Sequence, residues 1–99
     1  MKTLKAPKKS LGQNFLIDKN IINKIINISS IDKNSTIIEI GPGYGSLTEA
    51  ITSLNPKKIV AVEKDKSLTF FLTKKFKSYK NIYIVNEDIL DFILKKKIK

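Results

Sequence analysis

The segment Glu39-Ile-Gly-Pro-Gly-Tyr-Gly45 is the feature that most constrains how this chain folds. An apolar run over residues 36–40 leads into it and is typical of a buried strand, whereas residues 46–53 suit a helix. A strand, a tight glycine turn and a helix start form the layout of a nucleotide-binding loop. Glycine can adopt positive φ and lets a ligand lie against the backbone, and the segment has glycines at positions 41, 43 and 45.

The spacing of these glycines separates two kinds of cofactor. The dinucleotide fingerprint G-x-G-x-x-G, counted from Gly41, would need its third glycine at position 46, which is a serine. Alternating glycines with an acid two residues before the first one indicate S-adenosylmethionine. The alternative is a glycine-rich turn with no ligand. A nicotinamide-dependent oxidoreductase is disfavoured because no catalytic Tyr-Lys or His pattern accompanies the loop.

The composition limits the possible chemistry. The chain has 99 residues, which is one domain at most, and it contains neither cysteine nor histidine. Disulfides and thiolate metal sites are therefore excluded, and the commonest general base is missing. No apolar run approaches the roughly 20 residues that span a membrane. The N-terminal lysines are not followed by an apolar segment of the secretory type, so we expect a cytoplasmic protein.

The charge balance predicts a polyanionic partner. The formal net charge is +10, and every basic residue is lysine. We expect nucleic acid first and an anionic membrane surface second. The alternative is compositional drift, since the chain is also crowded with isoleucine and asparagine. Residues 1–10 form a basic arm that we predict to be mobile, either as a phosphate contact or as a solvated tail.

The segment after this arm introduces a helix. Leu11–Leu16 mixes apolar residues with two amides, and we expect it to lead into the helix, or alternatively to cover a ligand. Asp18 is a predicted N-cap for a helix that runs to about residue 29. Its isoleucines recur at helical spacing, and we predict that this stripe is part of the core: Ile21, Ile22, Ile25 and Ile26.

The rest of the chain alternates strands and helices. Residues 59–62 form a continuous apolar run, which suits a parallel strand buried on both faces. Asp65 is the next predicted cap. Its helix is predicted to have an apolar face, with Phe70 near the same stripe: Leu68, Phe71, Leu72, Lys75 and Phe76. Residues 82–85 read as a third strand, and a further helix begins at residue 89. A helix followed by βαβαβα predicts an α/β fold with half of a doubly wound parallel sheet.

Three features are predicted to meet at the carboxyl ends of these strands, where such sheets bind ligands. They are the glycine loop, Glu63 and Asp88. Glu63 follows Gly41 by 22 residues, close to the spacing of about 20 at which an acid reaches ribose hydroxyls. Asp88 is a candidate acceptor for the amine of adenine, with Glu87 as its competitor.

Glu39 lies within an apolar strand, so its carboxyl group needs a partner. We expect backbone N–H groups of the glycine turn, or the amino group of a ligand.

Two stretches in tandem carry a family resemblance: residues 9–16, Lys-Ser-Leu-Gly-Gln-Asn-Phe-Leu, and residues 39–48, Glu-Ile-Gly-Pro-Gly-Tyr-Gly-Ser-Leu-Thr. Together they resemble the ribosomal RNA adenine dimethyltransferases. Those enzymes methylate two adjacent adenines near the 3′ end of small-subunit rRNA. The related erythromycin-resistance methyltransferases act on large-subunit rRNA and share the Gln-Asn-Phe element. Gly12, Pro42 and the pair Leu47-Thr48 favour the small-subunit branch.

The resemblance implies a Rossmann-like class I methyltransferase fold with S-adenosylmethionine as cofactor. It implies that Asn14 and Leu16 cover the cofactor, that Gly41 approaches its methionine part, and that Glu63 and Asp88 hold its ribose and adenine. It further implies small-subunit rRNA as partner, a cytoplasmic monomer, and no metal.

One departure from the family pattern concerns catalysis. The family's catalytic segment, Asn-x-Pro-(Tyr or Phe), follows a fourth strand and does not occur in this sequence. The C-terminal helical domain of the family is also absent. We therefore expect residues 11–99 to be the N-terminal part of a methyltransferase domain, with no catalytic residue and no activity alone. The alternative is a non-catalytic RNA-binding derivative of the fold.

Overall fold

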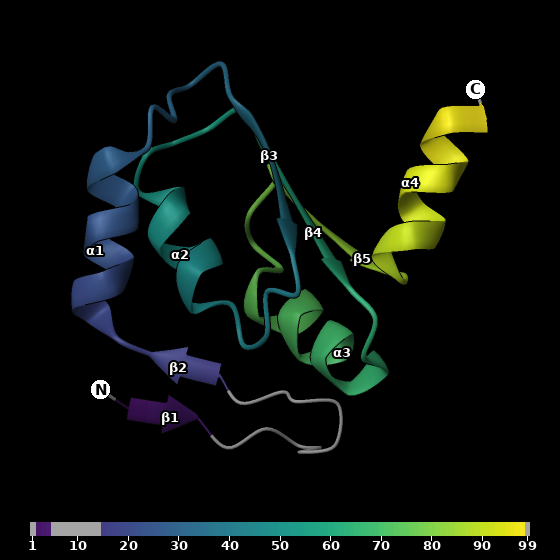
Figure 1. Cartoon of the computed structure of the whole chain (residues 1–99), viewed down its shortest axis with the longest axis horizontal. Coiled ribbons are helices and arrows are strands. Elements are labelled where there is room, and N and C mark those ends of the chain that lie inside the picture. Colours follow the sequence, from purple (N-terminus) through teal and green to yellow (C-terminus); the bar gives the residue numbers. More distant parts are fainter. Residues whose placement is uncertain (1, 5–14, 99) are drawn as a thin grey trace.

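The computed structural model describes residues 2–4 and 15–98, and its centre is a parallel sheet of three strands in the order β3-β4-β5 (Figure 1). The strands are β3 (Thr36–Ile40), β4 (Lys58–Glu63) and β5 (Ile82–Asn86). The connections between them contain α2 (Ser46–Thr52) and α3 (Lys66–Lys75). This is the βαβαβ arrangement that the alternation of apolar runs predicts.

The central strand, β4, is buried on both faces. Ile59 and Ala61 are 0% exposed, and Val62 is 2% exposed. Successive side chains of a strand point to opposite faces, so burial of neighbouring residues means that material covers both sides. The continuous apolar run of β4 is explained by this position, as the sequence predicted.

The main core lies on one face of the sheet, under α2 and α3. It consists of buried side chains from both helices and from β4 and β5: Ile51, Ile59, Leu72, Phe76 and Ile82. Partly buried Ile37 of β3 packs against the same cluster. Apolar contact across this layer joins the two connections to the sheet, and it supplies most of the burial that the described residues achieve.

The opposite face of the sheet is only partly covered. Helix α4 (Ile89–Ile98) lies on this side, across the sheet from α1 and α2 (Figure 1). Ile38 and Ile40 alternate with the core-facing Ile37 and are 54% and 61% exposed. On α4 itself, Leu90 is 67% exposed.

Among the described residues, no helix is long and apolar enough to cross a membrane.

Helix α1 (Lys19–Ile28) begins where the sequence predicted, because Oδ1 of Asp18 accepts hydrogen bonds from Asn20 N and Ile21 N. The prediction that its isoleucine stripe is core holds only in part: partly buried Ile26 packs against the core cluster, but the stripe as a whole is not core. No residue of α1 is buried, and Ile21 and Ile25 are 49% and 41% exposed. The physical reason is that α1 packs mainly beside α2, and α2 is a short helix that covers only part of the stripe (Figure 1).

The N-terminal segment also differs from expectation. Residues 2–4, predicted as part of a mobile arm over residues 1–10, form strand β1 (Lys2–Leu4), which pairs antiparallel with β2 (Phe15–Ile17). Strand pairing uses backbone N–H and C=O groups, and every residue type except proline supplies both. A lysine-rich composition therefore does not prevent this segment from forming a strand. Strand β2 then leads into α1, so the predicted lead-in is extended.

The asymmetry of the two sheet faces gives a prediction for stability. Ile59→Ala removes a fully buried side chain and should lower the free energy of unfolding by about 2–5 kcal/mol. The matched control Ile38→Ala, in a neighbouring strand but half exposed, should cost below about 1 kcal/mol. Urea denaturation of the chain measures both, and equal losses would contradict a main core that lies on the face under α2 and α3.

Candidate functional site

The parallel register brings the carboxyl ends of the three strands together at one edge of the sheet. Gly41 N donates to Val62 O at 2.9 Å, one residue before Glu63. Glu87 N donates to Glu63 O at 3.1 Å, one residue before Asp88. The glycine loop, Glu63 and Asp88 are therefore adjacent, as the sequence predicted.

The glycine loop is a left-handed turn with open space on one side. Gly41, Gly43 and Gly45 have φ of 66°, 62° and 85°, a region that side chains other than glycine rarely adopt. A Cβ built on Gly41 would meet no atom within 4 Å. The backbone of Gly41 is thus accessible to a ligand, which fits a loop against which a cofactor lies.

Gly45 has a different reason to be glycine. A Cβ at this position would lie 2.8 Å from Cε2 of Phe76 and 3.0 Å from Cδ2 of Leu72. The start of α2 packs so closely on α3 that no side chain fits between them. The sequence pattern grouped the three glycines as ligand contacts, whereas the structure assigns Gly45 to helix packing.

The glycine loop is fastened to α3 by a lysine. Lys75 Nζ donates to Tyr44 O at 2.8 Å and lies 3.2 Å from Oε1 of Glu49 on α2. The rings of Tyr44 and Phe71 meet edge to face, with centroids 5.1 Å apart. Sequence reasoning did not assign Lys75 a role, although a lysine on the apolar face of a helix is a signal that the charge has a specific partner.

Glu63 is a buried acid at the end of the central strand. It is 3% exposed, and its Oε2 accepts a hydrogen bond from Asp65 N at 2.9 Å. Asp65 in turn caps α3, as predicted, by accepting from Leu68 N at 3.0 Å. The amide of Asn86 donates to Glu63 O at 3.0 Å and ties β5 to the same point. Backbone contacts therefore fix where the Glu63 carboxylate lies.

The two acids after β5 have different surroundings. Glu87 forms an ion pair with Lys95 of α4 through Oε2. Asp88 is exposed, and its Oδ1 accepts from Leu90 N at 2.9 Å, which caps α4. Sequence reasoning missed this capping role. The Glu87 carboxylate is engaged by α4, so Asp88 stays the better candidate for a ligand contact.

Glu39 finds its partner on α2. Thr48, which is 0% exposed, donates its hydroxyl to Oε1 of Glu39 at 2.5 Å. This partner is a side chain of α2, which the sequence analysis did not predict. Burial raises the pKa of the Glu39 carboxyl group above its ordinary value of 4.5, and the hydrogen bond from Thr48 partly opposes this rise. The pair joins β3 to α2 directly beneath the glycine turn.

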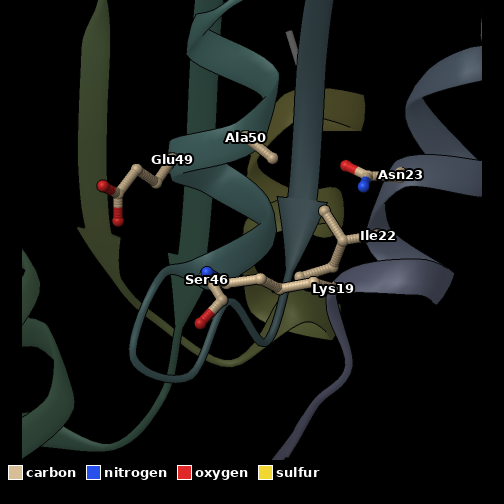
Figure 2. Close-up of a pocket in the computed structure, with 6 residues that line it drawn as sticks. All are labelled: Lys19, Ile22, Asn23, Ser46, Glu49 and Ala50. Carbon is tan, nitrogen blue, oxygen red and sulfur yellow. The ribbon is translucent and has the colours of Figure 1, made fainter.

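A pocket of about 320 Å³ lies between α1 and α2, beside the end of the glycine loop. Lys19 extends from α1 toward Ser46, the first residue of α2 (Figure 2). Gly41, Glu63 and Asp88 do not line this pocket. Asn14 lies outside the described residues, and Leu16 belongs to β2. No cluster of metal-ligating side chains occurs within residues 2–4 and 15–98.

A protein-family profile described as "Ribosomal RNA adenine dimethylase" matches residues 5–99, nearly the whole chain. The chain belongs to this family. Curated relatives include the ribosomal RNA small subunit methyltransferase A of Staphylococcus haemolyticus, 51% identical over 92 residues, and that of Staphylococcus epidermidis, 57% identical over 83 residues. These alignments cover 93% and 84% of the chain but 31% and 28% of the relatives. The chain thus spans less than a third of the length of the relatives it matches.

Solved structures of methyltransferases share the fold. The 23S rRNA methyltransferase ErmE superposes with a TM-score of 0.71 at 31% identity, covering 78% of this chain and 31% of that one. A dimethyladenosine transferase from Plasmodium falciparum gives 0.68 at 28% identity, covering 75% and 27%. A coclaurine N-methyltransferase, at 17% identity and 0.63, shares the fold alone. The three parallel strands are the N-terminal part of the class I methyltransferase fold, as predicted.

The different roles of two glycines predict different costs for the same substitution. Gly41→Ala adds a side chain in open space and should cost about 1–2 kcal/mol for its left-handed φ. Gly45→Ala adds the clash with Phe76 and should cost about 1–3 kcal/mol more. Urea denaturation compares the two free energies of unfolding. A larger loss for Gly41→Ala would contradict the packing role of Gly45.

The raised pKa of Glu39 predicts how stability depends on pH. Between 4.5 and the folded pKa, the folded chain binds more protons at Glu39 than the unfolded chain does. This contribution to the free energy of unfolding is fully present below 4.5 and is lost as pH rises through the folded pKa. Glu39→Gln is always neutral, so its stability relative to wild type should increase from about pH 4 to about pH 7.

Denaturant titrations at several pH values measure this difference. Thr48→Val removes the hydrogen bond that lowers the pKa, and it should move the pH-dependent window upward. A difference between Glu39→Gln and wild type that does not change with pH would show that Glu39 has the same pKa in the folded and unfolded chains.

Proposed function

We propose that the gene product containing this chain transfers methyl groups from S-adenosylmethionine to N6 of two adjacent adenines near the 3′ end of small-subunit rRNA. The observation that carries this proposal is the meeting of an accessible glycine loop, a buried glutamate and an exposed aspartate at one sheet edge. These belong to a chain of the ribosomal RNA adenine dimethylase family.

The residues at this edge suit the parts of the proposed cofactor. The open backbone of Gly41 admits the methionine part. Glu63 accepts hydrogen bonds from both ribose hydroxyls, and its burial strengthens them because the local dielectric is low. The exposed Asp88 accepts from the amine of adenine through the carboxylate that caps α4. In the same proposal, Asn14 and Leu16 cover the cofactor from the N-terminal side.

The role of this chain in the reaction is to bind and orient. S-adenosylmethionine supplies an electrophilic methyl group, so the protein mainly has to align the accepting nitrogen with it. The residues described here hold the cofactor from the loop and the strand ends. The target base would have to leave its stack to reach the cofactor, which other parts of the gene product would assist.

The relatives favour the small subunit over the large subunit as the source of the substrate. The relatives at 51% and 57% identity are named small subunit methyltransferases, whereas the 23S rRNA methyltransferase ErmE is 31% identical. An erythromycin-resistance type of activity is therefore the second candidate. We further propose a cytoplasmic monomer, in keeping with a substrate that is a ribosomal RNA.

The test uses the full-length gene product with Glu63→Gln. Tritiated methyl transfer to small-subunit rRNA should be measurable for wild type and absent for large-subunit rRNA. Glu63→Gln removes a charged hydrogen-bond acceptor and should weaken binding of S-adenosylhomocysteine by about 10- to 150-fold, the equivalent of about 1.5–3 kcal/mol. Calorimetric titration measures this affinity.

Asp91→Asn, at an exposed acid of α4, is the matched control and should bind like wild type. Binding of S-adenosylhomocysteine that is unchanged by Glu63→Gln would remove Glu63 from the site. RNA binding without any methyl transfer or cofactor binding would instead support a non-catalytic derivative of the fold.

A further inference from the structure

We propose that the outward face of α3, with the turn that follows it, is a binding surface for single-stranded RNA, with Phe70 as a stacking platform and Lys66, Lys74 and Lys77 as phosphate contacts. The proposal rests on the proposed function in taking ribosomal RNA as the polyanion. It adds a surface outside the cofactor edge, by which we mean the edge of the sheet that carries the glycine loop, Glu63 and Asp88.

Phe70 is exposed where helix packing would not place an aromatic ring. At about 100° per residue it lies about 200° around the helix from both Leu68 and Leu72, which are 0% exposed. Phe70 itself is 65% exposed. The apolar face of α3 is complete without it, so the core does not explain a phenylalanine at this position.

Lysines surround this ring, and the segment that carries them contains no acid of its own, although one of its lysines, Lys75, pairs with Glu49 of α2. Lys66 and Lys74 lie one turn to either side of Phe70 on the helix, and Lys77 follows in the turn after the helix ends at Lys75. Lys74 Nζ is 4.6 Å from the centroid of the Phe70 ring. Residues 66–80 contain five lysines and neither aspartate nor glutamate. Compositional drift toward lysine does not by itself remove the acids from one surface.

This combination fits RNA better than a membrane. Single-stranded nucleic acid is bound by a basic surface that follows the backbone and by aromatic rings on which bases stack. An amphipathic helix that binds membranes needs a broad apolar face to insert. The apolar face of α3 is turned into the core, which leaves only Phe70 and the less exposed Phe71, whose ring contacts Tyr44. The surface also begins three residues after Glu63, next to the cofactor edge.

The experiment measures binding of a fluorescein-labelled oligoadenylate of about 12 nucleotides by anisotropy, at several salt concentrations, with the full-length gene product. Phe70→Ala should weaken binding by about 5- to 150-fold, as for one lost base stack, with an unchanged salt dependence. Lys74→Met keeps the aliphatic stem and should reduce the slope of log affinity against log salt by about 0.7.

Lys33→Met is the matched control, because it removes one exposed lysine from the connection between α1 and β3, at the opposite end of the sheet (Figure 1). Lys33→Met should change the slope of log affinity against log salt less than Lys74→Met does. At one fixed salt concentration it should also change the affinity less than the α3 variants do. All variants should keep wild-type affinity for S-adenosylhomocysteine and wild-type melting temperature, since their side chains face away from the core.

The surface is overturned if Phe70→Ala and Lys74→Met bind the oligonucleotide like wild type, or if Lys33→Met has the same effect as Lys74→Met. It is also overturned if Phe70→Ala abolishes sedimentation with phosphatidylserine vesicles while RNA binding is unchanged, which would indicate a membrane contact. If the Phe70→Ala protein transfers methyl groups and binds RNA with wild-type affinity, the RNA-binding surface is rejected and the proposed function stands. If the variants weaken RNA binding as predicted but the wild-type protein transfers no methyl groups, the proposed function is rejected and the RNA-binding surface stands.

Discussion

The pairing of β4 with a parallel neighbour on each side is the constraint on which the rest of this structure depends. It aligns Ile40, Val62 and Val85 across the sheet, and the ladder continues past the strands through the bonds of Gly41 and Glu87. Because parallel strands end at the same edge, three segments far apart in the sequence meet there through the backbone pairing of the strands. The backbone register thus determines where the residues of the candidate site lie, and their side chains determine what the site can bind.

Polar groups beside this edge are held by short-range partners. Glu63, Asp65 and Thr48 are the buried polar residues of the described structure, and each has a hydrogen-bond partner. Burying a hydroxyl without such a partner would cost about 2–7 kcal/mol, and burying an ionised carboxylate without one would cost far more. The turn after β4 therefore has little freedom: Asp65 N binds the Glu63 side chain while the Asp65 side chain caps α3. This arrangement fixes the Glu63 carboxylate before any ligand arrives.

Local features of this fold could be predicted from the sequence, and features that depend on a second layer could not. The caps at Asp18 and Asp65 involve partners two or three residues away, so the sequence alone located them. The partner of Glu39 is nine residues away on another element, and the reason for Gly45 is a phenylalanine 31 residues later. The spacing of the isoleucines showed which face of α1 packs against the rest of the chain. How much of that face is buried depends on the short helix α2, which the spacing does not reveal. The positions of Gly41, Glu63 and Asp88 were predictable because strand ends follow from apolar runs.

Helix α3 connects the cofactor edge to the remainder of the molecule through its two faces. Its inner face closes on the glycine loop: Leu72 and Phe76 leave no room beyond a glycine at position 45, and Lys75 holds the Tyr44 carbonyl. A rotation of α3 that disturbed these contacts would move the loop, because the loop has no independent core. The outer face carries its lysines and Phe70 on the same rigid element. A polyanion bound to that face would therefore be held in a fixed geometry relative to the loop, with only the width of one helix between them. Direct transfer of a methyl group requires such a fixed relation between donor and acceptor, since misplacement by about 1 Å is enough to slow a reaction that depends on alignment.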